Sequence, residues 1–237
     1  MTAALGTLGA LERGELEPLG LLPRASNFTF LARVRDGEEE LLAVYKPIAG
    51  EAPLSDFPQG TLAAREVAAY VLAEALGWPR VPPTVFRDGP HGPGAVQLFV
   101  PFDPDEHFFT LQETLPDAFR RVALFDVVTN NADRKAGHCL LGHDGELFVV
   151  DHGVCFHVEP KLRTVIWDFV GEPIPADLAS DLDALEPRLR QGEPRDELLE
   201  LLGDEEVTAV HARLARLLEL GRFPGPGPGR SYPWPAV

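Results

Sequence analysis

Cysteine is scarce in this sequence, with only Cys139 and Cys155 among 237 residues. Two cysteines cannot form the network of disulfides that stabilises small secreted domains. Long apolar runs are also missing, because no window approaches the roughly 18 uninterrupted apolar residues of a membrane-spanning helix. The N-terminal stretch lacks a basic opening and is interrupted by Glu12, Glu15 and Glu17, unlike a secretory signal. We therefore expect a reduced, cytoplasmic protein without stable membrane insertion.

Positive charge is the second scarce component, since Lys and Arg number 21 against 37 Asp and Glu, for a net charge of −16. Nucleic-acid phosphates require a basic surface, so this balance argues against nucleic acid as a partner. It also disfavours adhesion to an anionic membrane leaflet. A basic protein or a neutral small molecule suits the charge better. The only lysines are Lys46, Lys135 and Lys161, which makes the position of each informative.

Residues 1–100 carry the patterns of a small sheet with one helix laid across it. Residues 1–24 predict a short helix and a turn, and residues 61–76 have the apolar spacing of a helix that ends at Gly77. Runs of β-branched and aromatic residues between turn signals predict strands. The predicted strands span residues 26–35, 40–46, 84–87 and 95–100.

From residue 101 the sequence becomes mainly helical. Apolar spacing predicts helices over residues 115–129 and 175–221, and Asp144-Gly145 predicts a hairpin between residues 139–142 and 147–150. Alternating Pro and Gly predict an extended arm at the end of the chain. The sequence therefore predicts an α+β fold with a β-rich lobe (1–100), a mainly helical lobe (101–222) and a tail (223–237).

The first candidate functional residue is Lys46, at the end of the apolar strand sequence LLAVYKP. An ammonium group on a partly buried strand face needs an anion, because burying an unpaired charge is costly. Glu66, on the predicted helix that follows, is the obvious protein partner. In kinases such a Lys–Glu pair places the ammonium against nucleotide phosphates. The alternative is an edge-strand lysine that reaches solvent.

Polar residues crowd the run 130–138, where an apolar helix ends and a strand begins. Loops at such junctions commonly hold catalytic groups on a rigid base. Asp133 could accept or orient a hydroxyl proton, and Arg134 or Lys135 could neutralise the charge of a transferred phosphoryl group. The alternative is a helix-capping turn with solvated charges.

Asp151 ends a second apolar strand, and Gly153 allows a sharp turn directly after it. A carboxylate in this position suits Mg²⁺, which proteins often bind through one or two carboxylates together with substrate phosphates. An aspartate that caps the next turn is the alternative. A zinc site is a further alternative, although the spacing of its candidate ligands matches no familiar pattern. Those candidates are His138, Cys139, His143, His152, Cys155 and His157.

Taken together, these motifs resemble a known superfamily. The strand lysine in VYKP, the helix glutamate in AAREVAAY, the DRxxxH sequence at Asp133 and the DHG sequence at Asp151 are similar to the phosphatidylinositol 3-/4-kinase-like superfamily of atypical kinases. Longer phrases such as FDVVTNNADRKxGH resemble the small bacterial SCO1664 family of that superfamily, over roughly residues 20–220. The resemblance implies a two-lobed, protein-kinase-like fold. It also implies an ATP-dependent phosphotransferase that uses Mg²⁺ or Mn²⁺ and has an unidentified acceptor.

The resemblance also implies roles for individual residues. Lys46 would contact the α- and β-phosphates and pair with Glu66, Asp133 would be the catalytic-loop aspartate, and Asp151 would bind the metal. A short loop containing Ser26 and Asn27 would cover the phosphates. The backbone of a hinge would hold adenine, with two apolar side chains, Leu98 and Phe99, beside the ring. That hinge would consist of Gln97, Leu98, Phe99 and Val100.

The sequence departs from the superfamily pattern at the phosphates and at the metal. It has neither a Walker A nor a GxGxxG pattern, so phosphate binding would depend on the Ser26-Asn27 turn and Lys46. His138 stands where the superfamily has the asparagine that binds a second metal, and imidazole suits Mn²⁺ or Zn²⁺ better than Mg²⁺. Three functions stay open: a phosphotransferase acting on a protein or small-molecule hydroxyl, a nucleotide-binding pseudokinase that regulates, and a kinase-fold enzyme that transfers another group such as AMP.

Overall fold

The computed structural model describes residues 2–23 and 27–237, with side chains from residue 6 onward in the first range. Its N-terminal part is an antiparallel five-stranded sheet with the strand order β1-β2-β3-β5-β4. Two helices accompany it, α1 (Thr2–Arg13) and α2 (Leu62–Leu76). The strands are β1 (Glu15–Leu21), β2 (Phe30–Asp36), β3 (Glu39–Pro47), β4 (Thr84–Gly89) and β5 (Gly92–Leu98).

Strand β1 is an element that the sequence patterns missed, as they also missed the short helix over 108–111. Its sequence ELEPLGL contains glutamate, proline and glycine, which are all depleted in strands. It forms an edge of the sheet, pairs only with β2, and has an irregular register between Pro18 and Gly20. Edge strands tolerate these residues because one side of the strand needs no ladder partner.

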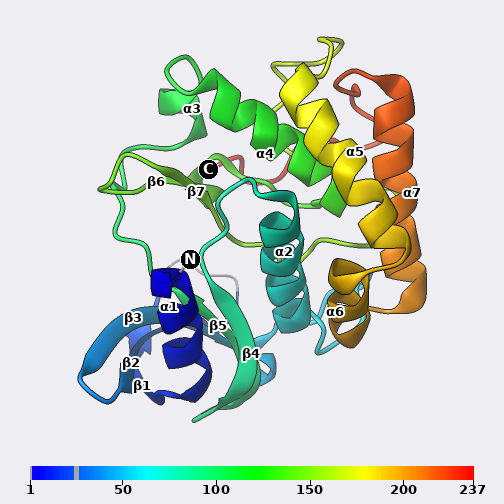
Figure 1. Cartoon of the computed structure of the whole chain (residues 1–237). Helices are drawn as coiled ribbons and strands as arrows, with labels where there is room; N and C mark the ends of the chain where they lie inside the picture. Colours follow the sequence, from blue (N-terminus) through cyan, green and yellow to red (C-terminus); the bar gives the residue numbers. More distant parts are fainter. Residues whose placement is uncertain (1, 24–26) are drawn as a thin grey trace.

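The two helices lie on opposite faces of the sheet, as the blue and cyan helices of Figure 1 show. Leu11 of α1 packs against Ala43 and Tyr45 of β3. Ala63 and Val67 of α2 pack against Ala95 of β5. Ala95 pairs with Lys46, and paired residues share a face of a sheet. Alternation along β3 therefore directs Lys46 toward α2 rather than toward α1.

The rest of the chain is mainly helical and packs against α2 (Figure 1). One core cluster joins Leu72 of α2 to Phe125, Leu182 and Leu214. A short 3-10 turn, η1 (Ile48–Gly50), precedes α2 in the first part. The elements of the helical part are α3 (Phe108–Leu111), α4 (Pro116–Thr129), η2 (Ala136–His138), β6 (Cys139–Leu141), β7 (Leu147–Val149), α5 (Ala176–Arg190), α6 (Glu193–Leu201) and α7 (Asp204–Leu220). The α+β class and the β-rich and helical parts agree with the sequence prediction.

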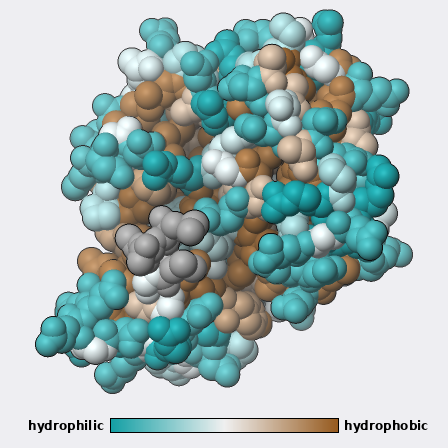
Figure 2. Space-filling model, in the orientation of Figure 1, coloured by the Kyte–Doolittle hydropathy of each residue, from teal (hydrophilic) through white to brown (hydrophobic). Residues whose placement is uncertain are grey.

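The surface and the tail complete the description. Hydrophilic residues predominate on the face shown in Figure 2, and hydrophobic residues form separate patches. Among the described residues, no helix has the length and apolar character to cross a membrane. The tail forms no helix or strand but is not a free arm, because Phe223 is buried against Phe169, with 5.5 Å between ring centroids, and Pro233 is buried as well.

Candidate active site

Lys46 meets two carboxylates at the junction of the sheet and the helical part. Its Nζ lies 2.5 Å from Glu66 Oε1 and 3.1 Å from Asp151 Oδ1. Burial alone would lower the pKa of the Lys46 ammonium, but the charges of Asp151 and Glu66 raise that pKa above its ordinary value. The lysine is therefore charged and held between β3, α2 and the DHG turn. The expected Lys46–Glu66 pair is in contact, and solvent is not its main partner.

Glu66 also fixes the DHG turn. Its Oε2 accepts the backbone N–H of His152 at 2.9 Å, so one carboxylate joins Lys46 to this turn. Gly153 packs closely against α2, because a Cβ there would lie 3.3 Å from Leu62 Cβ and 3.4 Å from Glu66 Oε1. Asp151 adopts a φ of 64°, a conformation uncommon for residues other than glycine. Such backbone strain is often found at functional sites.

Asp133 lies on the loop after α4, with its side chain one-third exposed and its Oδ2 3.4 Å from Lys135 Nζ. Burial raises the pKa of the Asp133 carboxyl, and the charge of Lys135 opposes that rise. The backbone N–H of Asp133 donates to Asn131 Oδ1 at 2.9 Å, which fixes the start of the loop. Lys135 therefore stays a candidate for offsetting charge beside Asp133.

Arg134 takes a different place from the one predicted. Its side chain is fully buried, with Nη2 3.0 Å from Asp126 Oδ1 and Nη1 donating to Val150 O at 2.8 Å. A guanidinium held in this way cannot neutralise a phosphoryl group in a cavity, so that predicted role does not fit the structure. Arg134 instead ties the loop to α4 and to the end of β7. Its partner Asp126 was missed, although an aspartate within the apolar run VALFDVV (122–128) was a usable signal.

His138 orients Asp151. Its Nδ1 accepts the backbone N–H of Lys135 at 3.3 Å, and its Nε2 lies 3.2 Å from Asp151 Oδ2. Burial lowers the pKa of His138 to about 4, so the ring is neutral near pH 7. With Nδ1 accepting, the single ring proton lies on Nε2, the ring atom in contact with Asp151.

This arrangement limits how a metal can be held. With Nδ1 accepting the Lys135 N–H, the Nε2 of His138 carries the ring proton and offers no lone pair to a cation. Asp151 has a half-exposed side chain, and a single carboxylate fits a Mg²⁺ or Mn²⁺ ion whose other ligands are phosphate oxygens and water. The donor set thus fits one metal at Asp151 better than a second metal at His138.

The zinc alternative finds no support in the structure. In the ranges 2–23 and 27–237, no three His, Cys, Asp or Glu side chains form a group that could hold a metal ion. Cys139 and Cys155 are buried free thiols. Burial raises the pKa of the Cys139 thiol to about 12 and also raises that of Cys155, so both act as small apolar groups.

The charged groups converge on one cavity of about 210 Å³. Lys46 and Glu66 line it from the β3 and α2 side, and Asp133 and Asp151 line it from the helical part. Asn27 also lines it, and its Oδ1 accepts the N–H of Ala52 at 2.8 Å. Ser26, the other predicted phosphate-loop residue, lies outside the described residues.

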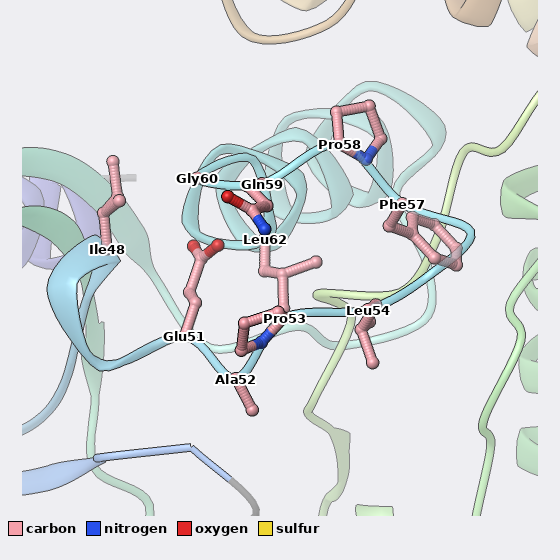
Figure 3. A pocket seen from close by; sticks show the side chains of 10 residues that line it. All are labelled: Ile48, Glu51, Ala52, Pro53, Leu54, Phe57, Pro58, Gln59, Gly60 and Leu62. Atoms are coloured by element: carbon pink, nitrogen blue, oxygen red, sulfur yellow. The ribbon is translucent and has the colours of Figure 1, made fainter.

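A second cavity of about 310 Å³ adjoins the first beneath the loop that leads into α2 (Figure 3). Glu51 points from this loop toward the start of α2, where its Oε1 accepts the N–H of Ala63 at 3.0 Å. Phe57 is buried against His157, and Asp56 pairs with Lys161 at 3.1 Å. The two cavities share the lining residues Glu51, Ala52, Leu54 and Leu62.

The predicted hinge does not fit the structure in detail. The N–H groups of Leu98 and Phe99 donate to Pro83 O at 2.8 Å and to Leu42 O at 2.9 Å, so neither is free for adenine. Leu98 pairs with Ala43 and packs on the α1 side, so its expected contact with the adenine ring is not supported. Gln97 is buried and donates to Thr84 Oγ1 at 2.8 Å. None of residues 97–100 lines the charged cavity.

Comparison with known proteins places this chain among its relatives. No family model matches the sequence. Protein Rv2133c of Mycobacterium tuberculosis (strain ATCC 25618 / H37Rv) is 41% identical over an alignment of 262 positions, which covers 95% of this chain and 94% of that protein. The chain belongs to the Rv2133c family.

More distant relatives of this Rv2133c-family chain are plant enzymes. Phosphatidylinositol 4-kinase gamma 4 of Oryza sativa subsp. japonica is 26% identical over 230 residues, which cover 78% of this chain and 39% of the enzyme. Phosphatidylinositol 4-kinase gamma 2 of Arabidopsis thaliana is 25% identical over 214 residues, which cover 70% of this chain and 38% of the enzyme. The chain thus spans about two fifths of the length of these plant relatives.

Solved structures show that the fold of this Rv2133c-family chain is kinase-like. The Helicobacter pylori proinflammatory kinase CtkA aligns with a TM-score of 0.54 and 12% identity over 90% of this chain and 94% of that one. The Golgi casein kinase with Mn/ADP bound aligns with a TM-score of 0.59 and 14% identity over 92% of this chain and 75% of that one. At these identities the likeness concerns the fold alone.

The side chains of this site in the Rv2133c-family chain determine which ligands it can bind and which proton it can accept. A charged lysine held by Glu66 can bind phosphate oxygens, a half-exposed Asp151 can hold a divalent cation, and Asp133 can accept a proton. These groups come from both parts of a kinase-like fold and face one cavity.

Proposed function

We propose that this Rv2133c-family protein is an ATP-dependent phosphotransferase that transfers phosphate to a hydroxyl group of a protein or small molecule. The observation that carries the proposal is the convergence of Lys46, Asp133 and Asp151 on one cavity of a kinase-like fold. A metal-assisted phosphoryl transfer needs a cation for the phosphates, a carboxylate for the metal and a carboxylate for the acceptor. Lys46 supplies the cation, Asp151 the carboxylate for the metal and Asp133 the carboxylate for the acceptor.

ATP binding would depend on β3, α2 and the DHG turn. Lys46 donates to the nucleotide phosphates, and Glu66 keeps its ammonium in place through the 2.5 Å contact. Asp151 would hold Mg²⁺ or Mn²⁺, and its Oδ2 lies 3.2 Å from His138 Nε2. When bound, the metal neutralises the charge of the phosphates. Asn27, which fixes the loop at Ala52, would lie over the phosphates together with Ser26.

The transfer step uses Asp133. Its carboxylate orients the acceptor hydroxyl and accepts its proton, while a bond forms between the acceptor oxygen and the γ-phosphorus. The bond from the γ-phosphorus to the β,γ-bridging oxygen breaks, and ADP leaves with that electron pair. Lys135, 3.4 Å from Asp133, offsets charge next to the acceptor.

We also propose the finer classification that the sequence motifs suggest. The plant phosphatidylinositol 4-kinase relatives support a phosphatidylinositol 3-/4-kinase-like subtype. Membership of the bacterial SCO1664 family within it is proposed on the resemblance of the sequence phrases alone. The boundary between the two lobes would fall near residue 100, with residues 223–237 as a tail. A cytoplasmic location belongs to the same proposal.

His138 favours a second candidate, a nucleotide-binding pseudokinase. The resemblance has asparagine in this position as a second metal ligand, whereas here the ring accepts the Lys135 N–H at Nδ1 and contacts Asp151 through Nε2. A site with a single metal would still bind nucleotide and would turn it over slowly. This candidate predicts binding of ADP with Mn²⁺ and only slow release of ADP from ATP.

The test combines binding and turnover on the same protein. Thermal unfolding is followed with ATP or ADP and Mg²⁺ or Mn²⁺, since a ligand that binds the folded state raises the unfolding midpoint. ADP release and the mass of the products are then measured, because a gain of phosphate distinguishes a kinase from an AMP transferase. Asp133→Asn is expected to bind ADP normally and to lose transfer. Asp151→Asn is expected to lose metal-dependent binding, and Asp183→Asn, at an exposed position of α5, is the control. Unaltered transfer in both site variants refutes the proposal.

A further inference from the structure

The C-terminal tail returns to the catalytic loop that carries Asp133. In Figure 1 the end of the chain lies beside β6 and β7, and hydrogen bonds fix it there. Ala236 O accepts the backbone N–H of Ala136 at 2.8 Å, and Ser231 O accepts that of Thr164 at 3.1 Å. Ser231 O also accepts Trp167 Nε1–H at 3.2 Å. Ala136 and Thr164 are both buried, so the tail supplies the partners of two amides that water does not reach.

The amide of Ala136 occupies a decisive position in the loop. Ala136 begins the short turn η2, whose last residue, His138, contacts Asp151 at 3.2 Å. The residue before it, Lys135, pairs with Asp133. A displacement of Ala136 would therefore move both the group that orients Asp151 and the cation beside Asp133.

The second tail contact supports the same loop from its other side. Arg134 N–H donates to Arg163 O at 2.9 Å, and Val165 N–H donates to Arg134 O at 3.1 Å. Thr164 lies between Arg163 and Val165 in the sequence, and its backbone N–H donates to Ser231 O. The loop thus lies against residues 163–165, and the tail is bonded to both.

The tail also brings a charge to this region. Burial raises the pKa of the Asp133 carboxyl, and the charges of Lys135 and then Arg230 oppose the rise. Arg230 is exposed, and its Nε donates to Tyr232 O at 2.9 Å, which stabilises a bend around Ser231, the first of the two docking contacts. No residue of the tail lines the cavity that contains Lys46 and Asp151.

We propose that residues 230–237 are a positioning element of the catalytic loop, so that transfer, but not nucleotide binding, depends on them. The proposal rests on the proposed function for its transfer readout. Its structural part, the support of the loop through Ala136, can be measured without any turnover. The tail contacts the loop through its backbone carbonyls, and a separate peptide of the same sequence carries the same carbonyls. Adding that peptide to the truncated protein should therefore reverse the effect of removing the tail.

The experiment compares the full chain with a variant that ends at Gly229. Hydrogen exchange is measured on peptides that cover residues 134–142, and thermal unfolding is followed with ADP and Mn²⁺. The rate of ADP release from ATP and Mn²⁺, with water as acceptor, is measured in parallel. The peptide RSYPWPAV is then added to the truncated protein, with a scrambled peptide of the same composition as control.

We expect faster exchange in the loop peptides, an unchanged ADP-induced rise in the unfolding midpoint, and ADP release lowered about 10- to 100-fold, the scale of a small misplacement of reacting groups. The native peptide should restore protection and rate, and the scrambled one should not. Unchanged loop exchange overturns the proposal, and so does a loss of ADP binding equal to the loss of rate. If the full chain neither binds nor releases ADP, the proposed function fails, while loop deprotection reversed by the native peptide still supports positioning.

Discussion

Replacing Arg134 by leucine tests whether this arginine supports the loop or acts on phosphate. Both Arg134 and Asp126 are fully buried, and Arg134 donates to Asp126 from Nε at 3.1 Å and from Nη2 at 3.0 Å. Removing one partner of a buried ion pair typically costs about 3–5 kcal/mol, because the other charge is left uncompensated. For a chain of this size about 1 kcal/mol corresponds to a shift of about 2–4 °C. The unfolding midpoint of Arg134→Leu should therefore fall by about 6–20 °C.

The loss of stability in Arg134→Leu relative to the wild type should depend on pH, and the titration of Asp126 gives the direction of this dependence. Burial already raises the pKa of the Asp126 carboxyl in the folded state, and without the charge of Arg134 only the hydrogen bonds from Asn131 and Thr164 oppose it, so the pKa rises further above its unfolded value. A raised folded pKa stabilises the protein below the unfolded pKa, and that contribution is lost as pH rises through the folded pKa. The free energy of unfolding of Arg134→Leu should thus be closest to that of the wild type near pH 4–5 and should fall further behind it toward pH 7. Urea unfolding followed by tryptophan fluorescence measures this difference.

Two control variants make the result specific. Asp126→Leu combined with Arg134→Leu removes both charges and should recover a large part of the lost stability. Arg190→Leu removes an arginine whose side chain is 68% exposed and pairs with Glu186, and it should cost at most about 1 kcal/mol. If Arg134→Leu loses less than about 1 kcal/mol of stability and instead weakens ADP binding, the buried position assigned to Arg134 is refuted.

Three further predictions concern the cavity and the sheet that carries Lys46. Lys46→Met should weaken ADP binding by about tenfold or more in calorimetry, since a hydrogen bond to a charged group contributes about 1.5–3 kcal/mol; unaltered affinity contradicts it. His138 has a folded pKa of about 4, so the unfolded chain takes up its proton first and stability falls as pH drops below about 6.5. Urea titrations should show that lowering the pH from 7 to 4 reduces the free energy of unfolding of His138→Asn by up to about 3 kcal/mol less than that of the wild type. The exposed control His143→Asn should behave like the wild type, and equal losses in His138→Asn and the wild type refute the prediction. Gly94→Ala places a Cβ 2.4 Å from Lys46 O and should lower the unfolding midpoint and ADP affinity, whereas Gly20→Ala, whose Cβ meets nothing within 4 Å, should change neither.

The sequence predicted the elements that have a strong local pattern. Alternation along residues 40–46 directed Lys46 to one face of the sheet, and helical spacing after it supplied Glu66 as a partner, so their contact could be expected from sequence. Polar residues at the ends of apolar elements likewise identified the loops of Asp133 and Asp151. The sequence patterns did not predict β1, because its proline, glycine and glutamates are typical of a turn. Only its pairing with β2 makes this segment a strand.

Arg134, His138 and the tail could not be assigned in this way. By itself the sequence determined the α+β order and the residue types that phosphate and metal chemistry require, because strand and helix periodicity and turn residues are local properties. Only the tertiary structure decided that Arg134 is paired with Asp126, that His138 contacts Asp151, and that Ala236 O accepts the N–H of Ala136. Each depends on burial and on partners remote in sequence, and a side chain's charge and hydrogen bonds follow from its surroundings in the fold.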